Sequence, residues 1–197
     1  MYFVVSFMYA VPLAIVGLQL VLIGADAFEI SKCFLVASSS SLVGLILCWK
    51  CTSCCKPATL VTAGLTIGLV SAFFLLDYKA TNSTAEKMET RGKVLTDLMI
   101  GLVLTTVGYT VARCGLETQL LQLMPKSQYL CYQGKIVLRQ CLGAIIGATW
   151  SSFFLIMTES TVASFIPFMI IAAIFIIILL TYLKEKLQPH ASQVLKN

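Results

Sequence analysis

The segment Gly108–Leu123, GYTVARCGLETQLLQL, places two oppositely charged side chains inside one of the most apolar stretches of the chain. Arg113 and Glu117 are four residues apart, so on a helix the guanidinium and the carboxylate would be neighbours. The polar residues around them follow at steps of three and four: Thr106, Tyr109, Thr110, Arg113 and Glu117. That spacing forms a single stripe on a helix, opposite an apolar face. The sequence therefore predicts a helix whose polar stripe turns toward the inside of a bundle.

Two interpretations of the Arg113–Glu117 pair stay open at this point. A charge near the centre of a bilayer costs about 2.5–3.5 kcal/mol on insertion scales, and pairing with an opposite charge one turn away reduces that cost. In the first interpretation the two residues form a structural ion pair. Because charges inside membranes also mark routes for substrates and ions, the second interpretation is a polar pathway lined by the whole stripe.

The cysteine-rich stretch CWKCTSCCKP is the second group of side chains that could do chemistry. Cys48, Cys51 and Cys54 have the C-x2-C-x2-C spacing that begins an iron–sulfur ligand run. The fourth ligand position holds Ala58, however, and Cys55 comes too early. We therefore predict no metal and no cofactor. Cysteines beside lysines at the inner edge of a membrane are typical of S-palmitoylation, and the candidates are Cys51, Cys54 and Cys55, with unmodified thiols as the alternative.

Motifs of soluble enzymes are missing from the sequence. It contains no Walker loop, dinucleotide fingerprint, HExxH or G-x-S-x-G element. No recognisable nucleophile–base pair or metal-ligand set replaces them. We predict that the protein is not an enzyme.

Composition indicates which elements must position these residues. The chain is 58% hydrophobic and only 12% charged, about half the charged fraction of a soluble domain. A helix needs about 20 apolar residues to cross the hydrocarbon core of a bilayer, and six blocks qualify: 3–25, 33–49, 57–76, 98–124, 138–158 and 161–183. We predict an all-α, polytopic membrane protein with six transmembrane helices. The first block lacks the basic start and short core of a signal peptide, so we expect it to be retained as a helix.

Charge distribution predicts the orientation of these helices. With six helices, one side carries both termini and a single acidic residue, Glu185, against the basic residues Lys50, Lys56, Lys126, Lys135, Arg139, Lys184, Lys186 and Lys196. The other side carries more acidic than basic residues. Cytoplasmic loops are enriched in Lys and Arg, so we expect both termini, and the tail 184–197, to lie in the cytoplasm. We expect the protein itself in the plasma membrane or in an inner membrane. The net charge of +5 is then a signal of topology, and no nucleic-acid partner is expected.

The longest connection, 77–97, separates two groups of three helices and predicts a three-plus-three bundle. It lies on the expected outer side and contains the sequon Asn82-Ser83-Thr84, which makes Asn82 a candidate glycosylation site. Within the helices, small residues are spaced by four at Gly64 and Gly68 and again at Gly143 and Gly147. Such spacing lets two helices approach closely in lipid, so these four glycines are predicted helix-packing positions.

Two segments resemble one half of a major facilitator superfamily transporter. GADAFEISKCFLVASSSSLVGLILC, Gly24–Cys48, is similar to the outer loop and second helix of such a half. GLETQLLQLMPKSQYLCYQGKIVLRQCLGAIIGATW, Gly115–Trp150, is similar to its fourth helix, cytoplasmic loop and fifth helix. The family's G-x-x-x-D-x-x-G-R-R loop is absent between the second and third helices, which favours the C-terminal half.

The resemblance implies membrane transport of a small solute by a six-helix half or fragment. Full members of the family carry two such halves with the substrate site between them. A second six-helix half, or a second copy of this chain, is therefore an implied partner besides the lipid bilayer. The competing interpretation is a multi-pass membrane scaffold that transports nothing and binds other proteins through its outer loop and cysteine-rich edge.

Overall fold

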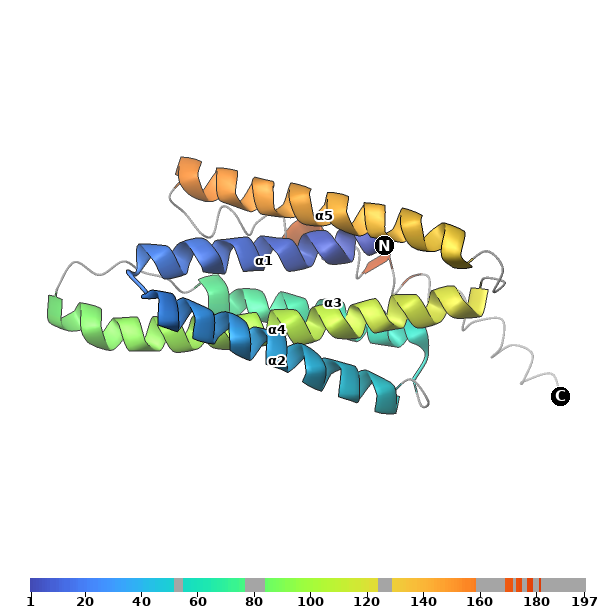
Figure 1. Ribbon diagram of the computed structural model, residues 1–197, viewed down its shortest axis with the longest axis horizontal. Helices are drawn as coiled ribbons and strands as arrows, with labels where there is room; N and C mark the ends of the chain where they lie inside the picture. The colour runs from blue at the N-terminus through green and yellow to red at the C-terminus, as the bar shows by residue number, and fades with distance from the viewer. Residues whose placement is uncertain are drawn as a thin grey trace.

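The protein is represented by a computed structural model of all 197 residues. It describes residues 1–51, 55–76, 84–123 and 129–158, and the short pieces 169–171, 173–174, 177–178 and 181. Within these ranges the secondary structure is helical, without strands. The five long helices are α1 (Tyr2–Leu22), α2 (Ala27–Cys51), α3 (Pro57–Leu76), α4 (Thr84–Leu123) and α5 (Tyr129–Thr158). They run alternately up and down along one axis (Figure 1).

The expectation of an all-α protein with membrane-length helices is confirmed in this coarse form. Each of the five helices contains a segment long and apolar enough to cross a membrane, as in an integral membrane protein that passes through it several times. The expected sixth helix, 161–183, falls mostly outside the described residues, and its described pieces are helical. The cytoplasmic tail 184–197 lies wholly outside them.

The helix bounds differ from those expected from the apolar blocks. The third helix has the expected bounds, 57–76, but α2 begins at Ala27, α5 at Tyr129 and α4 at Thr84. The connection between the third and fourth helices is therefore shorter than the expected 77–97, because residues 84–97 are helical. The sequence-based bounds stopped at the first charges, whereas a helix continues beyond the hydrocarbon core when its residues favour helix. Lys, Glu, Met and Arg in TAEKMETRGK are good helix formers.

The sharp turn between α1 and α2 follows from local backbone chemistry. Gly24 has φ +67°, which glycine adopts without steric penalty. Its N–H donates to the Val21 carbonyl at 3.0 Å, and the Ala25 N–H donates to the Leu20 carbonyl at 2.9 Å. These are the two bonds of a Schellman motif. They end α1 three residues before the expected position 25.

A capping box starts α2. The Glu29 N–H donates to Asp26 Oδ1 at 2.7 Å, and the Asp26 N–H donates to Glu29 Oε2 at 3.1 Å. This reciprocal pattern satisfies two amides at the helix start. Arg91 of α4 also contacts Glu29 Oε2, at 2.6 Å, and its terminal nitrogen donates to the Gly24 carbonyl. The α1–α2 turn is therefore bound to α4 by an ion pair.

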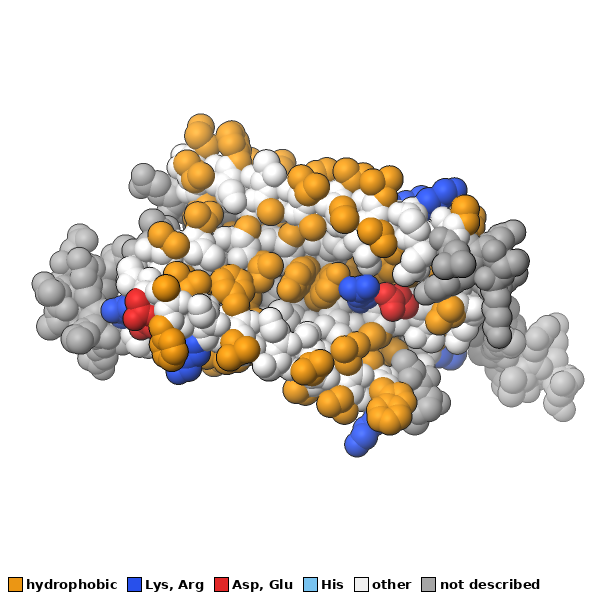
Figure 2. Space-filling model, viewed as in Figure 1, with side chains coloured by type: hydrophobic (Ala, Val, Ile, Leu, Met, Phe, Trp, Pro, Cys, Tyr) orange, Lys and Arg blue, Asp and Glu red, His pale blue; other side chains and the backbone are white. Residues whose placement is uncertain are grey.

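The helix α4 lies at the centre of the bundle. It packs against α1, α2 and α3, while α1 also packs against α5. The wholly buried apolar side chains come largely from α1 and include Val11, Ile15, Val16, Leu20, Leu75 and Leu102. The outer helices are different: only 22% of the apolar span of α2 and of α5 is buried, against 67% for α1. Figure 2 shows this apolar surface, with charged side chains mostly toward its two ends.

Glycines spaced by seven bring α3 and α4 into backbone contact. Gly101, Gly108 and Gly115 share one face of α4, because seven residues are close to two helical turns. A Cβ at Gly108 would lie 2.7 Å from the Gly64 carbonyl oxygen, and one at Gly115 would lie 2.8 Å from that of Pro57. Close approach of this kind is a main source of attraction between helices in lipid. We call this glycine contact between α3 and α4 the seam, and it holds α4, the helix with Arg113 and Glu117, against α3.

Candidate functional site: a polar cavity on α4

The polar stripe of α4 forms one wall of a cavity of about 420 Å³ between α1, α2 and α4. The stripe contributes Thr106, Tyr109, Thr110, Arg113 and Glu117. The other walls come from Tyr9 of α1 and from Ser41 and Leu45 of α2, and Cys114 of α4 completes the lining. The predicted stripe residues therefore do meet at one cavity, although the sequence did not assign to the pathway any of the residues that face them from α1 and α2.

Arg113 and Glu117 form an ion pair at the edge of this cavity. Arg113 Nε donates to Glu117 Oε1 at 2.9 Å. The Arg113 side chain is 46% exposed and that of Glu117 is 37% exposed. The two residues are thus paired across one helical turn, as their spacing predicted, but the other helices do not enclose the pair. Its charged ends are accessible from the cavity, and no other helix among the described residues supplies a salt-bridge partner to it.

Two stacked aromatic rings form the apolar part of the wall. The rings of Tyr9 and Tyr109 have centroids 4.3 Å apart and an interplanar angle of 23°. Offset stacking of this kind holds both rings in fixed positions. Because Tyr9 belongs to α1 and Tyr109 to α4, the pair also connects the two helices beside Arg113. Nothing in the sequence around Tyr9 distinguishes it from an ordinary apolar helix residue.

The two threonines of the stripe are buried and have hydrogen bonds of their own. Thr106 and the Ser40 hydroxyl of α2 share a hydrogen bond, and Thr110 donates to the Thr106 carbonyl at 2.8 Å. Gly44 of α2 lies against Thr110, where an added Cβ would be 3.1 Å from the threonine Cβ. The Thr106–Ser40 hydrogen bond therefore connects α4 and α2 beside the cavity, whereas Arg113, Glu117 and the tyrosines present accessible groups.

The predicted packing glycines occupy unlike environments. A Cβ on Gly64 would overlap the Gly108 and Ala112 backbone, and one on Gly143 would overlap the Phe3 carbonyl oxygen of α1. Gly147 is similarly close to the backbone of α1. A Cβ on Gly68 would meet nothing within 4 Å.

Of the cysteine and glycosylation candidates, the described ones, Cys51 and Cys55, are not among the residues that line this cavity. Cys51 is half-buried at the end of α2 and Cys55 is exposed beyond it, while Cys54 and Asn82 fall outside the described residues. Those residues contain no cluster of His, Cys, Asp or Glu that could hold a metal ion. Palmitoylation and glycosylation stay predictions.

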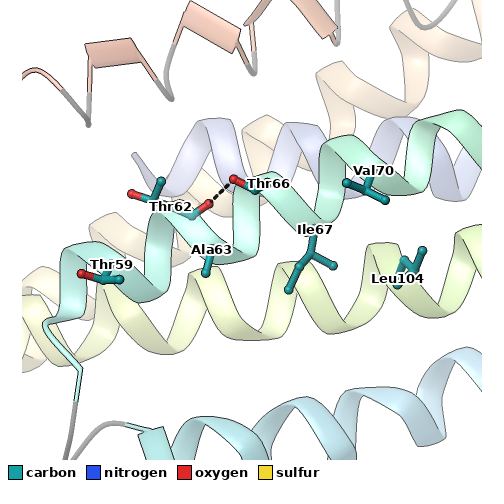
Figure 3. Close-up of a pocket in the computed structure, with 7 residues that line it drawn as sticks. All are labelled: Thr59, Thr62, Ala63, Thr66, Ile67, Val70 and Leu104. Atoms are coloured by element: carbon teal, nitrogen blue, oxygen red, sulfur yellow. Dashed lines mark hydrogen bonds between the residues drawn. The ribbon is translucent and has the colours of Figure 1, made fainter.

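A second hollow, of about 500 Å³, lies along the outer face of α3 (Figure 3). Its residues are Thr59, Thr62, Ala63, Thr66, Ile67, Val70 and Leu104. The hydroxyls of Thr62 and Thr66 donate back to carbonyls of their own helix at 2.9 Å. The described residues of this hollow form an apolar trough and include no charged group, so the cavity on α4 is the stronger candidate site.

No protein-family model, no curated protein and no solved structure matches this chain. The resemblance of 24–48 and 115–150 to a major facilitator half therefore stays a prediction from the sequence. The function has to be argued from the cavity itself.

Proposed function

We propose that the chain is a six-helix half of a secondary transporter and that the cavity on α4 is part of its solute pathway. The observation that carries this proposal is that a membrane-length helix, α4, holds a partly exposed ion pair, Arg113–Glu117, at the edge of a cavity. Arg113 lies about seven residues past the middle of the Arg91–Gln122 span, or about 10 Å along the helix axis. With the span centred in the bilayer, the guanidinium is inside the hydrocarbon core, which is about 30 Å thick.

Exposure at that depth argues for water in the cavity. Charged groups inside membranes nearly always face a bundle interior or a water-filled cavity, because exposure to acyl chains is costly. A purely structural pair would gain most from enclosure among helices. This one instead faces open volume together with two phenol rings, as a binding cavity requires: mostly apolar walls and a few polar groups that fix orientation.

The bundle also has exposed apolar edges that could contact a second six-helix unit, which alternating access requires. On the face seen in Figure 1, α2 and α5 form opposite edges with α1 and α4 between them. The exposed side chains of these edges are apolar, such as Leu42 and Ile46 of α2 and Leu142 and Ile145 of α5. In this proposal the two edges contact a second six-helix unit, so that the cavity lies between the halves. Both termini lie in the cytoplasm, and the helices form a three-plus-three arrangement.

Cysteine accessibility tests whether the cavity holds water. Leu45 and Leu47 of α2 are equally exposed, at 48%, but only Leu45 lines the cavity. In a cysteine-free background in membranes, we expect a charged, membrane-impermeant thiol reagent to label Leu45→Cys at least about tenfold faster than Leu47→Cys, because such reagents need a hydrated thiolate. Equal rates at the two positions would contradict a water-filled pathway.

Uptake of labelled small solutes into vesicles containing the full chain tests the pathway directly. Arg113→Gln and Glu117→Gln each leave one charge without its partner, and we expect both to lose most of the uptake. Normal uptake by both variants, at normal protein levels, would contradict the pathway and favour the interpretation of Arg113–Glu117 as a structural ion pair.

A further inference from the structure

The charges of the cavity point to the class of solute that it takes, if the proposed function holds. We propose that the cavity binds a small zwitterion of the α-amino-acid type, with an apolar and preferably aromatic side chain. Among the described residues, the cavity lining contains one cationic group, Arg113, and one anionic group, Glu117, one helical turn apart on α4. A ligand that carries an ammonium and a carboxylate on adjacent atoms presents the complementary pair.

Neutrality of the site favours a zwitterion over a singly charged ligand. A monoanion would compete with Glu117 for one guanidinium and would leave a carboxylate without a partner inside the membrane. A monocation would compete with Arg113 in the same way. Unpaired charges at that depth are strongly disfavoured. A zwitterion brings both charges, so each protein group keeps an opposite charge beside it.

The geometry of the ion pair leaves donors and acceptors for such a ligand. The contact to Glu117 engages Arg113 through Nε, and a guanidinium carries five N–H donors. Tyr109 is a further side-chain hydrogen-bond partner of the guanidinium, and the N–H groups that remain on the two terminal nitrogens can bind a carboxylate. Glu117 uses Oε1 in the contact, and its other oxygen is available to an ammonium. Both side chains are accessible enough to be reached, at 46% and 37%.

The remainder of the cavity suits an apolar side chain. The stacked rings of Tyr9 and Tyr109 adjoin the ion pair, and Leu45 faces them from α2. An aromatic side chain can add to a stack of rings with a gain beyond simple burial. The volume of about 420 Å³ is within the range of small-molecule sites, about 300–1,000 Å³.

Three probes that share a phenyl ring on a two-carbon chain separate the alternatives: L-phenylalanine, 3-phenylpropionate and 2-phenylethylamine. Binding to the full chain in lipid nanodiscs is measured for each by equilibrium titration. We expect L-phenylalanine to bind at least about tenfold more tightly than either singly charged probe, because each of them lacks one charge-assisted contact. Tighter binding of 3-phenylpropionate with uptake of a proton, or tighter binding of 2-phenylethylamine, would overturn the proposal.

Charge variants show whether Arg113 and Glu117 do the recognition. Arg113→Gln and Glu117→Gln should each weaken L-phenylalanine binding about tenfold or more. The double variant Arg113→Glu with Glu117→Arg keeps both charges in the cavity and should recover part of that loss. Variants that bind L-phenylalanine like the original chain would refute the assignment.

Protection from labelling provides a test in which the ion pair is unaltered. L-phenylalanine should slow the modification of Leu45→Cys by the thiol reagent, while 3-phenylpropionate at the same concentration should not. If Leu45→Cys is labelled rapidly and other solutes enter vesicles but L-phenylalanine neither binds nor protects, the zwitterion proposal fails while the proposed transport function stands. If Leu45→Cys is not labelled and no solute enters, both fail.

Discussion

Two glycines of one motif differ sharply in what surrounds them. Gly64 faces the α4 backbone so closely that a methyl group would overlap Gly108 and Ala112, whereas the same group on Gly68 would meet open space. Forcing an extra methyl into a packed interior typically costs about 1–3 kcal/mol. Where the obstacle is backbone, as at Gly64, relief requires the two helices to separate.

We therefore expect Gly64→Ala to destabilise the protein by about 1–3 kcal/mol and Gly68→Ala to leave stability nearly unchanged. Thermal unfolding in mild detergent, followed by the loss of helical circular dichroism or by aggregation, measures the difference. Gly68→Ala is the matched control, because both substitutions change the same residue type on the same helix. Equal effects at the two positions would mean that α3 and α4 do not meet through this seam.

At the scale of elements, one of the two carboxylates at the start of α2 has two tasks. Glu29 closes the capping box with Asp26 and also binds Arg91 of α4. Two variants separate these tasks. Gln can still close a capping box but has no charge, whereas Ala removes both contacts.

We expect Glu29→Gln to cost no more than about 1 kcal/mol, the usual value of a solvent-exposed ion pair. Glu29→Ala should cost up to about 1 kcal/mol more, because it also removes the hydrogen bond from the Asp26 N–H to the Glu29 side chain. The same unfolding measurement, repeated at high salt, checks the division, since salt screens the ion pair and leaves the cap largely unaffected. A larger loss for Gln than for Ala would contradict these roles.

The elements differed in how far their sequence predicted them. Apolar blocks predicted the five described helices, because hydrophobic length is a property of the local chain. The starts of α2 and α4 were missed, because Asp26, Glu29 and the polar residues after Thr84 favour helix through capping and intrinsic propensity. The stripe from Thr106 to Glu117 was found by its period. Tyr9 and Leu45 were not found, because their place at the cavity depends on how α1 and α2 pack against α4, and that packing leaves no pattern within either helix.

At the scale of the whole molecule, α2 and α5 expose most of their apolar side chains, and these side chains must be covered by lipid or by another protein unit. In the proposed function, they face a second six-helix unit. We expect native mass measurement after gentle extraction to show a particle with two such units, either two copies of the 21.5 kDa chain or one copy with another subunit. A homogeneous particle with one chain alone, which still took up solute in vesicles, would contradict the two-unit arrangement.

The uninterrupted length of α4 has a mechanical consequence. Arg91 and Arg113 are separated by 22 residues of one proline-free helix, about 33 Å at 1.5 Å per residue. The ion pair with Glu29 and the ion pair with Glu117 are therefore carried by one continuous helix. If α4 tilts as one rigid body in the proposed transport cycle, a displacement of Arg91 from Glu29 also moves Arg113 at the cavity, because both residues belong to the same helix.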